Sequence, residues 1–150
     1  MKRIFLIFLL LISCSKFCIA TVSKVWLEKV SWVAEKNAND GIPIKINLIY
    51  FYDEAYMKRI MEKDSKEYFE NFDTLKRDFG DKVEIYEFDV IPGQVKDGID
   101  VFPKKCDAKG AVLFARYNST EKSQKYSIGE DSEIRLIFKK DSVELLESKD

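Results

Sequence analysis

Residues 44–52 read IKINLIYFY, an alternation in which every second side chain is large and apolar. Lys45 and Asn47 fall on the opposite face at the start of the run. A period of two is typical of a β-strand that has one face against a core. Pro43 comes directly before, where a missing backbone N–H does least harm to a strand. Residues 37–41 read NANDG and predict a turn, because Asn, Asp and Gly tolerate left-handed backbone.

The next segment, residues 53–80, changes to a helical period. Asp53 and Asp64 are each placed to cap the start of a helix, and Glu67 occupies the capping-box position of the second start. Gly80 supplies a left-handed stop. Large apolar side chains recur at three- and four-residue steps, and these are Tyr68, Phe69, Phe72, Leu75 and Phe79. We therefore expect a helical insertion whose aromatic stripe packs into the core.

Further segments have the composition of strands, namely residues 22–34, 82–91, 99–102, 111–115, 134–138 and a last strand with Val143 and Leu145. The apolar phase slips within 82–91, which either a β-bulge or burial on different faces at the two ends would explain. Pro92 and Gly93 predict a type II turn after it. No βαβ rhythm is visible, so a parallel doubly wound sheet is not expected. The sequence predicts one mainly β domain at residues 25–150, a two-sheet antiparallel β-sandwich with a helical insertion after the second strand.

The composition narrows the classes of function. The chain has 150 residues, 46% of them hydrophobic, which is enough for a real core. The net charge of −1 leaves no footprint for binding nucleic acid. The chain has no histidine, which removes most acid–base, nucleophile-activating and zinc-binding arrangements. Because enzyme motifs are also absent, we expect no catalytic residue, no metal site and no cofactor.

Acidic pairs are the remaining candidates for chemistry, and they are Asp53 with Glu54, Asp78 with Asp81, and Glu130 with Asp131. Each pair falls at a predicted cap or turn, where acids commonly stabilise backbone N–H groups or face water. Residues 130–133 lack the alternating oxygen ligands around a glycine that a calcium loop needs. We therefore expect these acids to be caps or solvated side chains.

Lys2 and Arg3 form a short basic segment after Met1, and nine apolar residues follow at 4–12. This run is less than half of the ~20 residues that a membrane-spanning helix needs, and it suits the apolar region of a secretory signal peptide. Residues 11–14 read LISC, which matches the bacterial lipobox and predicts cleavage after residue 13. The competing interpretation is ordinary signal-peptidase cleavage after Ala20, which would discard Cys14 together with Cys18.

In the lipobox interpretation, Cys14 carries the lipid and residues 14–24 form a short tether. Several acyl chains at Cys14 would form the anchor, because a single chain holds a protein on a membrane only marginally. Cys18 and Cys106 could pair in an oxidising periplasm, or Cys106 could be an inert thiol. A nucleophilic role for Cys106 is not expected without a histidine to activate it.

Several short motifs occur in the order seen in a known family. They are LISC at 11–14, VSWVA at 30–34, NAN at 37–39, IPIKINLIY at 42–50, EYF at 67–69 and VIPGQ at 90–94. In this order they resemble the TssJ-like family, the small lipoproteins of type VI secretion membrane complexes. The resemblance covers about residues 25–95, and it is supported beyond Val101 only by general strand patterning.

The resemblance implies a transthyretin-like β-sandwich, anchored through acylated Cys14 to the periplasmic face of the outer membrane of a Gram-negative bacterium. It also implies that loops at one end of the sandwich dock the periplasmic domain of a TssM-like inner-membrane protein. Carried over to this chain, the partner-binding turn is Asn37, Asn39, Asp40 and Gly41. The helical insertion at 53–80 is longer than in the family, so partner contacts could lie there instead.

Two other classes of function stay open from the sequence. A periplasmic lipoprotein could bind a small molecule or glycan in an aromatic groove, using Tyr50, Phe51, Tyr52 and Tyr56. A deep aromatic pocket would favour this ligand binder, whereas packed aromatics with exposed end loops would favour the assembly component. A hydrolase would need two carboxylates that face one cleft.

Overall fold

The computed structural model describes residues 25, 27–118, 124–130 and 132–147. Both predicted cleavage sites, the predicted lipidation site Cys14 and Cys18 of the predicted tether lie outside the described residues, as does Asp131. The elements in chain order are β1 (Lys29–Ala34), the 3-10 turn η1 (Ala38–Gly41), β2 (Ile44–Phe51), α1 (Glu54–Met61), α2 (Ser65–Glu70), α3 (Phe72–Phe79), β3 (Val83–Val90), β4 (Val95–Asp100), β5 (Gly110–Arg116), β6 (Lys125–Ile128), β7 (Glu133–Phe138) and β8 (Val143–Glu147).

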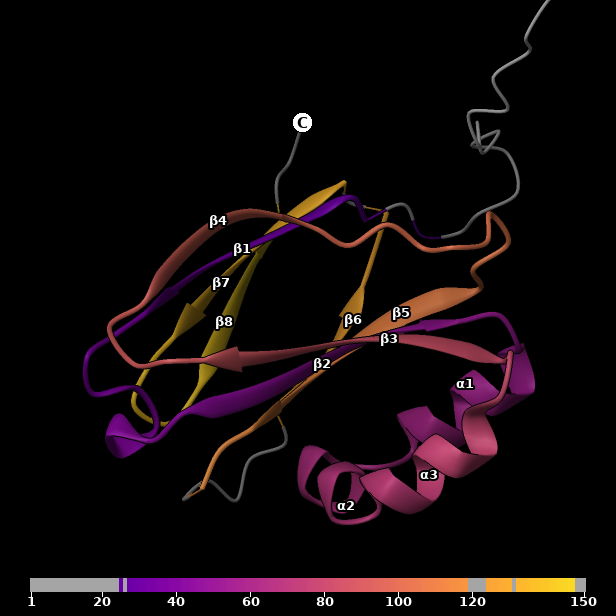
Figure 1. Cartoon of the computed structure of the whole chain (residues 1–150), viewed down its shortest axis with the longest axis horizontal. Helices are drawn as coiled ribbons and strands as arrows, with labels where there is room; N and C mark the ends of the chain where they lie inside the picture. The colour runs from indigo at the N-terminus through magenta and orange to yellow at the C-terminus, as the bar shows by residue number, and fades with distance from the viewer. Residues whose placement is uncertain (1–24, 26, 119–123, 131, 148–150) are drawn as a thin grey trace, which may run out of the picture.

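The strands form two four-stranded sheets that lie face to face, with orders β4-β1-β7-β8 and β3-β2-β5-β6 (Figure 1). The three helices follow β2 and lie together on the outer face of the second sheet. The predicted β-sandwich with a helical insertion after the second strand is therefore confirmed.

Strand β2 lies at the centre of its sheet, paired antiparallel with β3 and β5. Ile46 and Leu48 pack between the sheets, whereas Ile49 and Phe51 pack beneath the helices. Both faces of β2 are thus buried, although the alternation predicted only one. The difference arises because the helical insertion covers the face that would otherwise meet water.

The helices begin where the sequence predicts caps. Asp53 Oδ1 accepts a hydrogen bond from the backbone N–H of Tyr56 at 2.7 Å, and Asp64 Oδ1 accepts one from Glu67 N–H at 2.7 Å. These carboxylates satisfy backbone donors that the first helical turn leaves unpaired. Asp53 is therefore a capping acid, as expected for this member of the acidic pairs.

The aromatic stripe forms a second core between the helices and the sheet. The Tyr68 ring stacks on Phe114 of β5, with centroids 4.1 Å apart. Its hydroxyl accepts a hydrogen bond from Asn47 Nδ2 at 3.0 Å. The buried members of this core are Ile49, Phe51, Tyr56, Ile60, Tyr68, Leu75, Phe79, Val112 and Phe114. The prediction that the stripe is core is confirmed.

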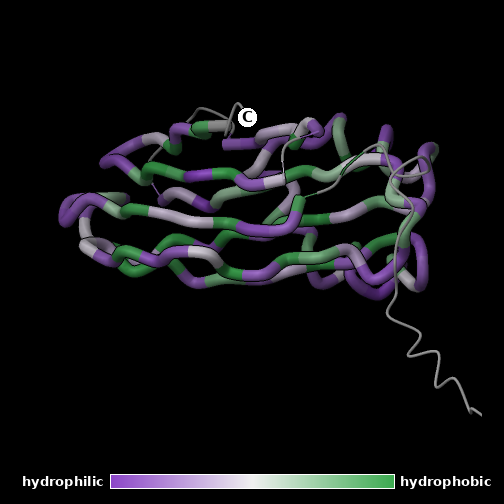
Figure 2. The backbone as a smooth tube through the Cα atoms, turned by 90° about the horizontal axis from the view of Figure 1, so that it is seen from above, coloured by the Kyte–Doolittle hydropathy of each residue, from purple (hydrophilic) through white to green (hydrophobic). Residues whose placement is uncertain are grey.

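The main core fills the space between the two sheets. Figure 2 shows the alternation of apolar and polar residues along the strands that produces it. Its fully buried members include Ile44, Leu113, Ile134, Leu136 and Phe138. The alternation in 134–138 therefore predicted the inward face of β7 correctly.

The structure corrects several details. Strand β1 pairs in parallel with β7, so the sheets are not wholly antiparallel. Strand β1 begins at Lys29, and the described residues before it (25, 27 and 28) are not in a strand, while residues 22–24 of the predicted segment lie outside the described residues. Strand β6 was not predicted. Strand β3 pairs with β2 in unbroken register, so no bulge occurs there. Its phase slip reflects two buried faces instead, because Val83 and Ile85 contact the helical core while Tyr86, Phe88 and Val90 contact the main core.

Candidate docking surface

The sandwich has two different ends. At one end, which we call the N-terminal end, the described chain begins and the loop at 101–109 lies beside it, since Val101 N–H donates to Glu28 O at 2.9 Å. At the other end, which we call the turn end, η1 meets the turns at 91–94 and 139–142 (Figure 1). Asn39 N–H donates to Lys140 O there at 3.0 Å. The eight residues of β2 that separate the ends span about 26 Å.

The η1 turn has an unusual backbone. Asn39, Asp40 and Gly41 have φ values of 48°, 53° and 82°, three consecutive residues in the left-handed region. Asn and Asp are the side-chain-bearing residues that adopt this region most readily, and Gly adopts it freely. The composition NANDG therefore predicted the turn for the correct reason.

Asn39 is 1% exposed, so its side chain lies inside the turn. Its Oδ1 accepts a hydrogen bond from Asn118 N–H at 2.8 Å, and its Nδ2 donates to Ile42 O at 3.1 Å. A buried amide with both groups bonded holds a turn in shape. Asn39 therefore shapes the surface of the turn end, and its side chain is not offered to a partner.

The other three residues predicted to bind a partner are at the surface. Asn37, Asp40 and Gly41 are all exposed. The Asp40 carboxylate lies 3.4 Å from Lys140 Nζ, and both side chains remain half or more exposed. The structure thus brings these polar groups to the turn end together with the 139–142 turn.

Sequence reasoning missed an apolar component of the same end. Ile42, Ile91 and Val95 are 43%, 55% and 62% exposed, and they are three of the five large apolar side chains that stand out as exposed in the described chain. Ile42 lies just before β2 and Ile91 just after β3, whose ends are joined by the pairing of Ile44 with Val90. Exposed apolar residues that gather at one place commonly mark an interaction site. The signal in the sequence was an isoleucine directly before each of two turn prolines.

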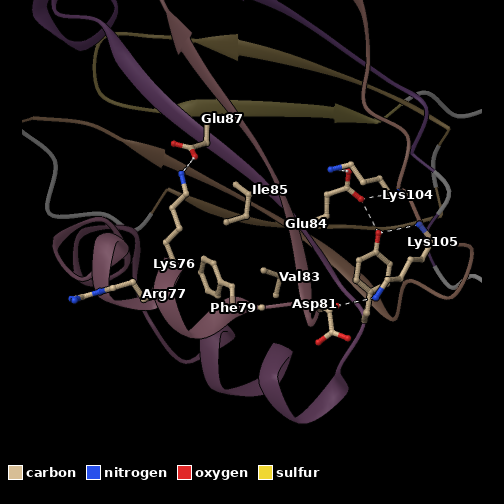
Figure 3. Close-up of a pocket in the computed structure, with 12 residues that line it drawn as sticks. Lys76, Arg77, Phe79, Asp81, Val83, Glu84, Ile85, Glu87, Lys104 and Lys105 are labelled. Carbon is tan, nitrogen blue, oxygen red and sulfur yellow. Dashed lines mark hydrogen bonds and ion pairs between the residues drawn. The ribbon is translucent and has the colours of Figure 1, made fainter.

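A second feature is a hollow of about 610 Å³ beside the free edge of β3, between α3 and the 101–109 loop (Figure 3). Its lining includes Tyr52, Lys76, Phe79, Glu84, Glu87 and Lys104. Lys76 and Glu87 form an ion pair across one side of it. These two charged groups are therefore already paired, while the guanidinium of the neighbouring Arg77 donates to Asp73 O and to Thr74 Oγ1.

Glu84 is the buried carboxylate of the hollow, at 7% exposure, and it was not predicted. Its Oε2 accepts hydrogen bonds from Tyr52 Oη at 2.8 Å and from the backbone N–H of Lys104 at 2.7 Å. Its Oε1 lies 3.4 Å from Lys104 Nζ. Burial, followed by the hydrogen bond to Glu84, raises the pKa of Tyr52 well above its usual range. Glu84 therefore fastens the 101–109 loop to the sheet.

The residues proposed for an aromatic groove do not line one. Tyr50 and Phe51 are fully buried in different cores, and Tyr56 is buried beneath the helices. Tyr50 Oη donates to the carbonyl oxygen of Val101 at 2.6 Å. Only Tyr52 of the four reaches the hollow. The aromatic residues are packed, and the loops at the turn end are exposed.

The acidic pairs are dispersed over the described chain. Asp53 caps α1, whereas Asp78, Asp81 and Glu130 are exposed. Among the residues that the structure describes, no three Cys, Asp or Glu side chains are grouped as metal ligands would be. In the same residues, no helix is long and apolar enough to cross a membrane.

The two-sheet fold is similar to that of solved lipoproteins of a bacterial secretion system. The chain resembles Lip from Serratia marcescens, a membrane-bound component of the type VI secretion system, with a TM-score of 0.62 and 16% identity over 81% of this chain and 96% of that one. It also resembles the type VI secretion lipoprotein TssJ1 from Pseudomonas aeruginosa, with a TM-score of 0.62 and 14% identity over 81% of this chain and 95% of that one.

A third similar structure is a chain of a type VI membrane complex, with a TM-score of 0.61 and 14% identity over 81% of this chain and 98% of that one. No protein-family model matches the sequence, and no curated protein matches it. The resemblance inferred from short motifs is therefore confirmed at the level of the fold.

Proposed function

We propose that this chain is a lipid-anchored, non-enzymatic subunit of a type VI secretion membrane complex. The observation that carries the proposal is the fold, which is shared with type VI lipoproteins over 81% of the chain and nearly all of theirs. The lipobox at residues 11–14 supports the same role independently, because it is a feature of the sequence outside the described domain.

The anchor in this proposal is diacylglycerol on the thiol of Cys14, with further acylation of the new N-terminus. Ser15 follows the cysteine, which under the enteric sorting rule favours the outer membrane. The chain carries a net charge of −1, so electrostatic attraction to an anionic membrane surface would not hold it. Lipid insertion would then supply the attachment to the periplasmic face.

The turn end is the proposed docking surface for the periplasmic domain of a TssM-like inner-membrane protein. It lies at the opposite end of the sandwich from the beginning of the described chain, and so it would point away from the anchoring membrane. It combines exposed Ile42, Ile91 and Val95 with the polar edge of Asp40 and Lys140. An apolar centre with a polar rim is the usual anatomy of a protein interface.

The alternative, a ligand-binding lipoprotein, is less well supported. Its aromatic residues Tyr50, Phe51 and Tyr56 are buried in the two cores. Two carboxylates of the hollow, Glu84 and Glu87, are each paired with a lysine. The packing of the aromatics and the exposed end loops favour the assembly role.

The test is affinity capture from membranes with the full chain and with Ile42→Asp and Ile91→Asp. Each variant should fold normally, because both side chains are about half exposed, and each should recover at least about tenfold less of a large inner-membrane protein. Leu146→Asp is the matched control, since Leu146 is 46% exposed but pairs with Arg135 away from the turn end. Equal loss with all three variants, or no loss with the two isoleucine variants, would exclude the turn end.

A further inference from the structure

We infer that a disulfide between Cys18 and Cys106 fastens the lipid-bearing tether to the N-terminal end of the sandwich, so that this end is held against the membrane. The inference rests on the proposed anchoring at Cys14. It adds a covalent link and an orientation that the proposed function does not require.

The structure records Cys106 as disulfide-bonded. The chain has only two other cysteines, Cys14 and Cys18, so one of them is its partner. A thiol that carries diacylglycerol is a thioether and cannot form a disulfide. If Cys14 bears the lipid, the partner of Cys106 is therefore Cys18.

Cys106 lies in a loop that is bonded to the domain on both sides. Before it, Tyr86 Oη donates to Phe102 O at 2.6 Å. Lys104 N–H donates to buried Glu84 at 2.7 Å, and both residues are drawn in Figure 3.

After Cys106, Lys109 N–H donates to Phe51 O at 2.7 Å, at the point where β2 ends. On the other side of the loop, Lys105 N–H contacts Tyr52 Oη at 3.3 Å. Because these hydrogen bonds hold the 101–109 loop against β2 and β3, a disulfide at Cys106 fixes the tether to a rigid part of the domain.

The disulfide reduces by about half the greatest distance that can separate the lipid from the domain. An extended chain spans at most ~3.6 Å per residue, so the eleven steps from Cys14 to Val25 allow about 40 Å. With the disulfide, only four steps separate Cys14 from Cys18, about 14 Å, and the bridge adds about 6 Å between α-carbons. The N-terminal end would then stay within about 20 Å of the lipid.

The chemistry is a thiol–disulfide exchange. The thiols of Cys18 and Cys106 lose two protons and two electrons as one S–S bond forms between them. A protein disulfide of the oxidising periplasm accepts the electrons and becomes a dithiol.

Trypsin cleavage sites separate the three cysteines onto different peptides, so the disulfide partner of Cys106 can be identified directly. Cleavage after Lys16 separates Cys14 from Cys18 and gives peptide 17–24, while cleavage after Lys105 gives peptide 106–109. Unreduced protein extracted from membranes should yield 17–24 joined to 106–109. Free thiols on both peptides while Cys14 is acylated would overturn the inference and leave the anchor intact. A link from 106–109 to the peptide with Cys14 would overturn both the inference and the anchor, because a disulfide-bonded Cys14 cannot carry the lipid.

The orientation has its own test, in which intact lipoprotein in vesicles is labelled with a membrane-impermeant lysine reagent. Lys104 at the N-terminal end and Lys140 at the turn end are matched, because both are ion-paired and 80% and 64% exposed. Lys104 should label several-fold less in vesicles than in detergent, and Lys140 should label equally in both. Cys18→Ser should stay in the membrane and lose this protection, whereas equal labelling of the two lysines in the native protein would contradict the orientation.

Discussion

The backbone N–H of Asn118 donates a hydrogen bond to Asn39 Oδ1 at 2.8 Å, which ties the η1 turn to the segment that follows β5. The two residues are 79 positions apart in the chain. Because η1 follows β1 of one sheet and Asn118 follows β5 of the other sheet, this hydrogen bond links the two sheets at the turn end. The shape of the proposed docking surface therefore depends on one buried amide.

Asn39→Gly isolates the contribution of that amide. Glycine keeps the left-handed backbone at no steric cost, so the variant loses only the side-chain hydrogen bonds. We expect the free energy of unfolding to fall by about 1–3 kcal/mol in denaturant titration. Asp40→Gly is the control and should change stability by less than about 1 kcal/mol, because its ion pair with Lys140 is exposed. A cost for Asp40→Gly as large as that for Asn39→Gly would contradict this account.

The hydrogen bond from Asn47 to Tyr68 joins the helical insertion to β2. Tyr68→Phe keeps the stacking on Phe114 and leaves the Asn47 amide buried without its partner, which should cost about 1–3 kcal/mol of unfolding free energy. Adding Asn47→Leu should recover part of that loss, because no polar group then remains unpaired. Strictly additive effects in this double-mutant cycle would show that the hydrogen bond does not couple the two residues.

Gly110 opens β5 directly beneath α1. A Cβ added there would lie 2.5 Å from Met57 Sδ, which is too close for a normal contact. Because Met57 is a flexible and only partly buried side chain, it can move aside, so Gly110→Ala should destabilise the fold by no more than about 1 kcal/mol, seen as a small fall in the thermal midpoint. Gly110→Ala combined with Met57→Ala should cost less than the sum of the single variants, and a full sum would mean that the clash is relieved elsewhere.

Stability should fall at alkaline pH. Burial raises the pKa of Tyr86 to about 12 in the folded state, against a value of about 10 in the unfolded chain. The folded state then holds the proton more tightly, so this contribution is complete below about pH 10 and is lost as pH rises through about 12. Tyr50 also contributes to the loss of stability at alkaline pH, because burial raises its pKa even more than that of Tyr86.

Tyr86→Phe tests whether Tyr86 contributes to the loss of stability at alkaline pH. The variant should unfold more easily at neutral pH, because the hydrogen bond to Phe102 O is lost, and its stability should decline less steeply above about pH 10. Denaturant titrations across this pH range provide the measurement. An unchanged alkaline slope would indicate that Tyr86 does not contribute to the linkage.

Local signals predicted most of the fold. The alternation in 44–52, the caps Asp53 and Asp64, and the turn at Pro92 and Gly93 all act within a few residues of one another. Gly93 has φ 81°, and Gln94 N–H donates to Ile91 O at 2.9 Å, as the predicted turn requires. Such features depend on backbone preferences that each short segment carries by itself.

Long-range relationships were not predictable in the same way. The parallel pairing of β1 with β7 joins segments about a hundred residues apart, and alternation gives no strand direction. From the sequence alone Glu84 would be expected at the surface, but in the fold the 101–109 loop covers it. Of the four residues predicted to bind a partner, Asn39 alone is buried, because Asn118 comes to it from a distant part of the chain.

The anchor at Cys14 is the central claim, and the N-terminal peptide of the mature protein tests it most directly. Protein from membranes of a Gram-negative host fed labelled palmitate should give an acylated peptide that begins at Cys14. Cys14→Ser should carry no label, and Cys18→Ser should carry as much as the native chain. An unmodified N-terminus at Thr21 in the native protein would contradict the account.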